Sequence, residues 1–355
     1  MISDLVVVGG GASAFMGAIT AKSNGLKSVI ILESTSKVLE KVRISGGGRC
    51  NITNSCNEID NLVDNYPRGE KQLIGLFTRF STIEAFDWFQ NRGLKLKVEN
   101  DGRVFPSSNS SNDVIKCLTD SAKQSGVKVI TDSHVKQISF NSEGFDLLVK
   151  GNTSFKTKKV LMCTGGHPSG RKLAKSMGHT IVKPVPSLFS FCTFENSLSL
   201  CSGITLDTQI TLTINKKNFF EKGSLLITHK GFSGPVIFRL SAFSARDLHA
   251  NNYKAKLKIN WLLRSEIETR SEIESFKLEN AKRLILNTKP FDNLPKSLWR
   301  AIVLSAHIDC ESKWADLTKK NREALIKCLT RQVYSIKSRG PFGEEFVTAG
   351  GILLK

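Results

Sequence analysis

Residues 5–33 contain the pattern that most restricts how this chain can fold. Leu5–Val8 are four apolar residues, as in a strand buried on both faces of a parallel sheet. A glycine-rich turn and a segment with helical spacing follow, and Asn24-Gly25 is a typical helix stop. Val29–Leu32 predict a second buried strand. This order predicts a strand–helix–strand unit, the building block of a parallel sheet.

The turn between the first strand and the helix has the composition of a dinucleotide-binding turn. Gly9 permits the tight turn, Gly11 lets the backbone approach a pyrophosphate, and Ala14 lets the helix pack closely on the strand. The amino end of the helix directs N–H groups at the phosphates. An acid about 20 residues further on accepts hydrogen bonds from the ribose. We therefore predict a dinucleotide site formed by Gly9, Gly10, Gly11, Ala12, Ser13, Ala14 and Glu33.

A second glycine-rich segment, KVRISGGGRCNITN, spans residues 41–54. It offers many backbone N–H groups to flavin edges or phosphates, and it is not a P-loop because Arg-Cys follows the glycines. The segment resembles the signature of the BaiN-like (aminoacetone-oxidase-type) NAD(P)/FAD-dependent oxidoreductases, K-x-x-x-S-G-G-G-R-C-N-x-T-N. The resemblance implies FAD as cofactor, with contacts from Lys41, Ser45, Gly46, Gly47, Gly48, Arg49, Cys50 and Asn51.

The resemblance extends along most of the chain, over residues 101–106, 160–166, 178–188, 228–235 and 346–351. It implies that Val135 holds the adenine through its backbone. It also implies a second flavin fingerprint, in which Thr164, Gly165 and Gly166 pass close to the cofactor. Family members continue past residue 351 with a segment that closes over the flavin. Since the given sequence stops at residue 355, we expect weaker FAD binding by these residues than by full-length relatives.

The implied fold is α/β, a Rossmann-type FAD-binding domain with an inserted β-rich unit that carries a helical subdomain. The runs 209–214 and 254–259 alternate as strands do, whereas apolar residues in 262–335 recur near helical spacing. We predict three parts from these patterns: an FAD-binding domain at 1–185 and 340–355, a β-rich domain at 186–260 and a helical subdomain at 261–339.

The charge of the chain is unevenly distributed. The net charge is +19, of which residues 1–150 carry +2 and residues 151–355 carry +17. Such asymmetry occurs in proteins that bind nucleic acid, but no dense basic block is present, so a lysine-rich solvated surface is the preferred interpretation. We therefore expect no nucleic-acid partner.

The chain also lacks the patterns of membrane, secreted and metal-binding proteins. No apolar run is long enough for a membrane span, and no basic-flanked signal opens the chain, so we predict a cytoplasmic protein without a membrane partner. Its eight cysteines are scattered without a C-x-x-C pair, which favours reduced thiols and no metal site.

Three residues have two interpretations each. Arg49 contacts the flavin or a substrate carboxylate, which is the preferred interpretation, or it forms a structural salt bridge. His167, after the second fingerprint, faces the flavin or is structural. His229 is an acid–base group or, with greater weight, a structural histidine. No residue is assigned a catalytic role.

These features lead us to expect an FAD-dependent oxidoreductase that transfers hydride between NAD(P)H, the flavin and a small organic substrate. Two alternatives remain. One is an FAD-containing RNA-modifying protein, which the positive charge of residues 151–355 suggests. The other is a non-catalytic flavoprotein remnant. The sequence does not indicate the oligomeric state.

Overall fold

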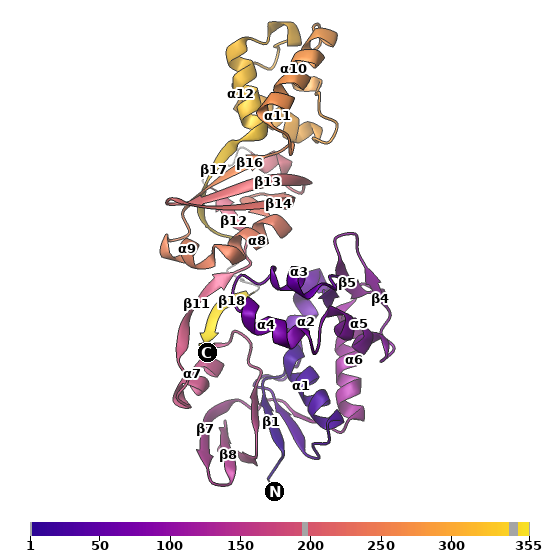
Figure 1. Cartoon of the computed structure of the whole chain (residues 1–355), viewed down its shortest axis with the longest axis vertical. Helices are drawn as coiled ribbons and strands as arrows, with labels where there is room; N and C mark the ends of the chain where they lie inside the picture. The colour runs from indigo at the N-terminus through magenta and orange to yellow at the C-terminus, as the bar shows by residue number, and fades with distance from the viewer. Residues whose placement is uncertain (1, 194–197, 341–346, 355) are drawn as a thin grey trace. The chain divides into compact units, whose positions relative to one another are not determined.

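The computed structural model describes residues 2–193, 198–340 and 347–354. The chain forms two compact units, whose elements are labelled in Figure 1. Unit 1 comprises Met1–Val182 and Gly351–Lys355, and unit 2 comprises Lys183–Gly350. The predicted return of the FAD domain at 340–355 includes residues 341–346 and 355, which lie outside the described residues.

A four-stranded parallel sheet forms the centre of unit 1. Its strand order is β10 (Val160–Met162), β1 (Leu5–Val8), β2 (Val29–Leu32) and β6 (Lys128–Ile130). Helix α1 (Ala12–Ser23) connects β1 to β2. The predicted strand–helix–strand unit and the Rossmann-type fold class are confirmed.

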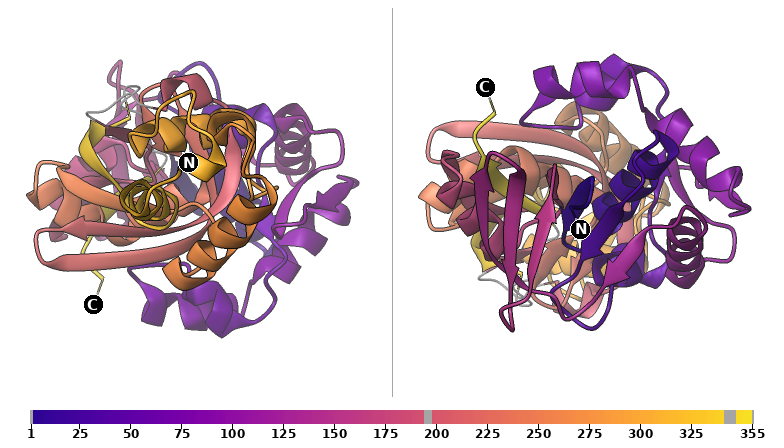
Figure 2. Two further views of the ribbon diagram at one scale, coloured as in Figure 1. Left: turned by 90° about the horizontal axis from the view of Figure 1, so that it is seen from above. Right: turned by 90° about the horizontal axis from the view of Figure 1, so that it is seen from below.

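Both faces of this sheet are covered. Because successive side chains of a strand point to opposite faces, Val7 packs with α1 and α6 (Ser111–Gln124), while Val6 and Val8 pack with the antiparallel meander β7–β8–β9. Figure 2 (right) shows the meander and α1 on opposite sides of the sheet. This double burial explains why the β1 sequence is apolar without alternation. The meander strands are β7 (Val135–Asn141), β8 (Gly144–Val149) and β9 (Ser154–Thr157).

The rest of unit 1 is built from short elements, including the antiparallel sheet β3–β5–β4. They are α2 (Glu40–Ile44), η1 (Ser45–Gly48), β3 (Thr53–Asn54), α3 (Ile59–Val63), α4 (Glu70–Phe77), α5 (Thr82–Gln90), β4 (Leu96–Val98), β5 (Arg103–Pro106) and α7 (Pro168–Ser176).

Unit 2 contains a closed antiparallel barrel with the strand order β12–β15–β14–β13–β16–β17. The predicted strands at 209–214 and 254–259 lie in β13 and β16. The prediction of helix throughout 262–335 is wrong at its end, because β17 pairs with β16 and β12 and closes the barrel. The strands are β12 (Phe191–Thr193), β13 (Thr205–Ile214), β14 (Lys217–Thr228), β15 (Gly231–Ser233), β16 (Ala255–Asn260) and β17 (Gln332–Arg339).

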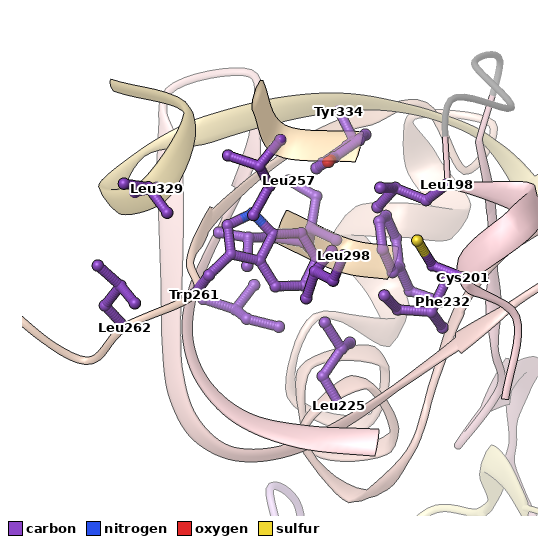
Figure 3. Close-up of a cluster of buried hydrophobic side chains, with 14 of the residues drawn as sticks. Leu198, Cys201, Leu225, Phe232, Leu257, Trp261, Leu262, Leu298, Leu329 and Tyr334 are labelled. Carbon is purple, nitrogen blue, oxygen red and sulfur yellow. The ribbon is translucent and has the colours of Figure 1, made fainter. Parts of the chain in front are cut away.

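Helices complete the core of unit 2. Leucine, isoleucine and tryptophan side chains from barrel and helices form one continuous buried cluster, part of which is drawn in Figure 3. Pro295 precedes α11, as expected of a residue that cannot continue a preceding helix. The helical elements are η2 (Ser199–Cys201), α8 (Pro235–Phe243), α9 (Ala245–Ala250), α10 (Glu266–Glu279), η3 (Ile285–Asn287), α11 (Lys296–Ser305), η4 (Trp314–Asp316) and α12 (Lys319–Thr330).

Strands β11 (Ile181–Ser187) and β18 (Val347–Ile352) pair with each other and contain the points where the chain passes between the units. Of the described helices, none has both the length and the apolar composition that crossing a bilayer requires.

Candidate cofactor-binding site

Three consecutive glycines shape the turn after β1. Gly9 has φ +105°, and a Cβ there would lie 2.5 Å from the carbonyl oxygen of Cys163. A Cβ on Gly10 would lie 2.9 Å from a carboxylate oxygen of Glu33. A Cβ on Gly11 would meet no atom within 4 Å. Gly9 and Gly10 are therefore required by packing within the protein, whereas Gly11 faces open space that a ligand can fill.

Glu33, at the end of β2, is held by a set of donors. The N–H of Gly10 donates to Oε2 at 2.6 Å, and Oε1 accepts from the N–H of Thr35 at 2.8 Å and from the hydroxyls of Ser34 and Thr35. Partial burial opposes ionisation, but these hydrogen bonds outweigh it and lower the pKa of Glu33. Among the described residues Oε2 accepts one bond, so an ionised Glu33 keeps an acceptor position for a ligand hydroxyl.

A cavity of about 850 Å³ opens where the carboxyl ends of β1, β2 and β10 meet. In parallel α/β sheets this edge is where ligands bind. Most of the residues predicted as cofactor contacts line it: Gly9, Gly10, Gly11, Ala12, Ser13, Glu33, Lys41, Ser45, Cys50, Asn51, Val135, Thr164 and Gly165.

The other predicted contacts lie outside the lining. Ala14 is fully buried on the side of α1 that packs against the sheet, which is the role predicted for a small residue there. The remaining members are Gly46, Gly47, Gly48, Arg49 and Gly166.

The segment at 45–51 contributes its two ends to the cavity and turns away between them. Gly46, Gly47 and Gly48 have φ of 56°, 68° and 84°, in the left-handed region that favours glycine. A Cβ on Gly47 or Gly48 would meet open space.

Burial raises the pKa of the Cys50 thiol, although a hydrogen bond with Ser45 opposes this shift. A thiol that stays protonated at neutral pH is a poor nucleophile.

Arg49 forms an ion pair. Its Nη1 lies 2.6 Å from Oε1 of Glu99, and its guanidinium lies 4.0 Å from the ring centroid of Phe105. This geometry corresponds to the salt-bridge interpretation of Arg49.

The second predicted fingerprint follows β10. The N–H of Cys163 donates to the carbonyl of Val8 at 2.8 Å, which fixes Thr164 and Gly165 beside the first glycine turn. His167 lines the cavity and also caps α7, because its Nδ1 accepts from the N–H of Ser169. His229 lies in unit 2, between β14 and β15, and is exposed.

Sequence reasoning missed several lining residues. Ser34 and Thr35 follow Glu33 directly, so their place in the chain could have identified them. Met16 on α1, Lys37 after Glu33, and Ser133 and His134 before Val135 are also close in the chain to predicted residues. Other missed side chains come from separate segments that no local pattern connects to the turn, among them Phe80, Phe89, Val114 and Leu118.

Within the described parts of the chain, all eight cysteines are free and no cluster of His, Cys, Asp and Glu could hold a metal ion. Burial also raises the pKa of the Cys163 thiol beside the cavity. The cavity lining therefore offers backbone N–H groups, hydroxyls and apolar walls, together with charged and polar side chains. These are Glu33, Glu40, Lys37, Lys41, Asn51, His134 and His167.

Comparison with known proteins gives a family and distant relatives. The family described as HI0933-like protein Rossmann domain matches residues 3–355. A 3-dehydro-bile acid delta(4,6)-reductase of Clostridium scindens is 26% identical over 98% of this chain and 86% of that protein. A ribosomal RNA dihydrouridine synthase of Haemophilus influenzae is 26% identical over 68% of this chain, and the match spans only 61% of the relative. A solved 3-ketosteroid-delta4-(5alpha)-dehydrogenase from Rhodococcus jostii has a TM-score of 0.46 at 12% identity, over 99% of this chain and 84% of that one.

Proposed function

Because the chain belongs to the HI0933-like Rossmann-domain family, we propose that it is an FAD-dependent oxidoreductase. The observation that carries the proposal is the cavity at the carboxyl ends of β1, β2 and β10, where Gly11 faces open space and Glu33 keeps an acceptor position. A pyrophosphate is compatible with this turn because α1 has no acidic residue in its first turn and presents its N–H groups there.

The residues of the cavity divide between the two halves of FAD. Gly11 and Ser13 would hold the pyrophosphate, Glu33 the ribose and Val135 the adenine, all in one connected lining. Ser45, Asn51 and Gly165 would border the flavin ring. Bound FAD supplies hydride transfer to and from carbon. The chain's own contribution is to hold Glu33 ionised and to exclude water with its apolar walls.

We propose that the substrate is a small organic molecule with a reducible carbon–carbon double bond and that NAD(P)H is the reductant. The name of the Clostridium scindens relative describes such a reduction, and the match covers nearly all of this chain.

An RNA substrate is the second candidate. It is favoured by the name of the Haemophilus influenzae relative and by the net charge of +17 on residues 151–355. Forming dihydrouridine also saturates a carbon–carbon double bond, so both candidates require the same flavin chemistry.

The test is the absorption spectrum of the purified protein after incubation with FAD and gel filtration. We expect flavin bands near one flavin per chain, and their bleaching by NADH or NADPH without oxygen. A colourless protein would reject the proposal and favour the non-catalytic alternative. Retained flavin that neither nucleotide reduces would reject NAD(P)H as reductant and keep the cofactor assignment.

Comparing turnover of a bile-acid enone with turnover of an unmodified ribosomal RNA fragment separates the two substrate candidates.

A further inference from the structure

Three rows of outward side chains cross neighbouring strands of the barrel in unit 2, two of them over four strands and one over three. Residues opposite each other in antiparallel strands share a face, so the pairing of β14, β13, β16 and β17 defines the rows. We call this surface the lysine face. Its rows are Asn218, Thr213, Lys256 and Ser335; then Phe220, Thr211, Lys258 and Val333; then Lys222, Gln209 and Asn260.

The lysine face is exposed, and the alternate side chains of the same strands fill the barrel. Phe220 is 55% exposed and Val333 is 46% exposed, so two apolar side chains lie on this surface. Lys256 and Lys258 are exposed as well, while Leu257 between them is fully buried. The alternation places both lysines on the outer surface together with Phe220.

Positive charge on this face is not balanced locally. None of its residues is acidic, and no ion pair among the described residues involves Lys222, Lys256 or Lys258. Two carboxylates of the same strands lie beside the face. Glu221 points away from the face and pairs with Arg239 at 3.2 Å, and Asp207 lies one row beyond Gln209.

Although the charge pattern of the sequence alone predicted no nucleic-acid partner, we propose that the lysine face binds single-stranded nucleic acid. Lysine ammonium groups pair with phosphates, and the exposed Phe220 ring offers a face on which a base can stack. Most of the remaining side chains are hydroxyls and amides, which donate to and accept from base edges. Four strands about 4.8 Å apart make a surface about 14 Å wide, enough for a few nucleotides. This binding needs no flavin, so it stands or falls separately from the proposed function.

The experiment measures the affinity of the full chain for a labelled oligouridylate of about 20 nucleotides. Fluorescence anisotropy follows binding at salt concentrations of about 50–300 mM. The key variant is the triple substitution Lys222→Gln, Lys256→Gln and Lys258→Gln. Each phosphate contact on a single strand contributes about −0.7 to the slope of log affinity against log salt. Removing three such contacts should therefore make the slope less steep by about 2. Affinity at low salt should fall at least about tenfold. Phe220→Ala should weaken binding about tenfold and leave the slope unchanged.

The matched control replaces Lys116, Lys123 and Lys128, which are exposed on unit 1, by glutamine. It removes the same charge and should change affinity less than about threefold. All substituted side chains face solvent, and unchanged melting temperatures show that each variant folds.

Equal losses in the two triple variants would overturn the proposal, because binding would then follow net charge alone. Unchanged affinity in the barrel variant would overturn it as well. Binding of phosphatidylserine vesicles without binding of RNA would assign the face to a lipid surface instead.

Discussion

The two units use their interiors in opposite ways. In unit 1 the sheet separates two apolar clusters, and a cavity remains open at the carboxyl ends of the strands. In unit 2 one continuous cluster fills the barrel and reaches into the helices, and the part drawn in Figure 3 includes Trp261. Trp261, Trp299 and Trp314 are almost completely buried. A parallel sheet leaves its strand ends free for ligands, whereas a small closed barrel is filled by its own side chains. Unit 1 is therefore suited to bind within its fold, and unit 2 is suited to bind on its outer surface.

The largest expected effect is a test of the filled interior. Trp299 packs against Trp314, with ring centroids 6.2 Å apart, and its indole N–H donates to the carbonyl of Ile285 at 2.8 Å. Trp299→Ala should destabilise unit 2 by about 3–5 kcal/mol because it leaves a cavity and an unpaired carbonyl. Urea unfolding followed by circular dichroism measures this. Phe220→Ala, at an exposed barrel position, serves as the control and should cost about 0.5 kcal/mol or less. A cost for Trp299→Ala as small as the control's would contradict the filled interior.

The next effect tests the open cavity through Glu33. Glu33→Gln keeps the shape of the side chain but removes its charge, and charge-assisted hydrogen bonds contribute about 1.5–3 kcal/mol. FAD affinity should therefore fall roughly 10–150-fold. Titration of the apoprotein with FAD, followed by flavin fluorescence, measures the change. Glu143→Gln, in an exposed ion pair with Lys156, is the matched control and should leave affinity unchanged. If both variants bind FAD like the wild type, Glu33 is not the ribose acceptor.

A pair of glycine substitutions separates packing from ligand contact in one turn. Gly9→Ala should destabilise the protein by about 1–3 kcal/mol, because φ is +105° and the new Cβ would meet the Cys163 carbonyl. Gly11→Ala should leave the melting temperature nearly unchanged and weaken FAD binding, because its Cβ would enter only the open space of the cavity. Thermal unfolding without FAD and titration with FAD give the two readouts. Full FAD affinity in Gly11→Ala would show that the cofactor does not approach this turn.

A smaller effect decides between the two interpretations of Arg49. The half-buried Arg49–Glu99 pair and the contact with Phe105 should contribute about 1 kcal/mol or less. Arg49→Met should lower stability by that amount and leave FAD affinity unchanged if the residue is structural. A loss of FAD affinity tenfold or larger would instead place Arg49 at the flavin.

The smallest effect concerns a partly exposed carboxylate at the edge of unit 1. A hydrogen bond from Lys158, with others from the backbone of Ser28 and Lys27, lowers the pKa of Asp4 to about 2. A group whose pKa is lower in the folded state stabilises the fold above its unfolded pKa and loses that contribution as pH falls through the folded value. The contribution should therefore disappear between about pH 4 and pH 2. Melting temperatures across this range should fall more steeply for the wild type than for Asp4→Asn, and parallel curves would exclude the linkage.

Local contacts explain what could be predicted from the sequence. Residues 5–33 form their strand, turn, helix and strand through contacts within about 30 positions, so the apolar runs and glycines were sufficient. The same holds for β13, in which buried residues alternate with partly exposed ones from Thr208 to Ile214. The resemblance of residues 41–54 to a flavoprotein signature pointed to the family that the comparison then confirmed.

The tertiary structure alone decided which distant segments meet. Leu118 becomes a cavity wall only because α6 packs against α1, and Phe80 reaches the same cavity from the segment between α4 and α5. Arg49 is turned to Glu99, 50 positions away, by a loop conformation that its own sequence does not specify.

Strand β17 was wrongly predicted as helix, although Tyr334 and Ile336 alternate with more exposed residues. A short apolar pattern that follows helical segments does not distinguish a strand from a helix. It is a strand because β16, more than 70 positions earlier, offers it backbone partners, and those hydrogen bonds exist only once the barrel closes.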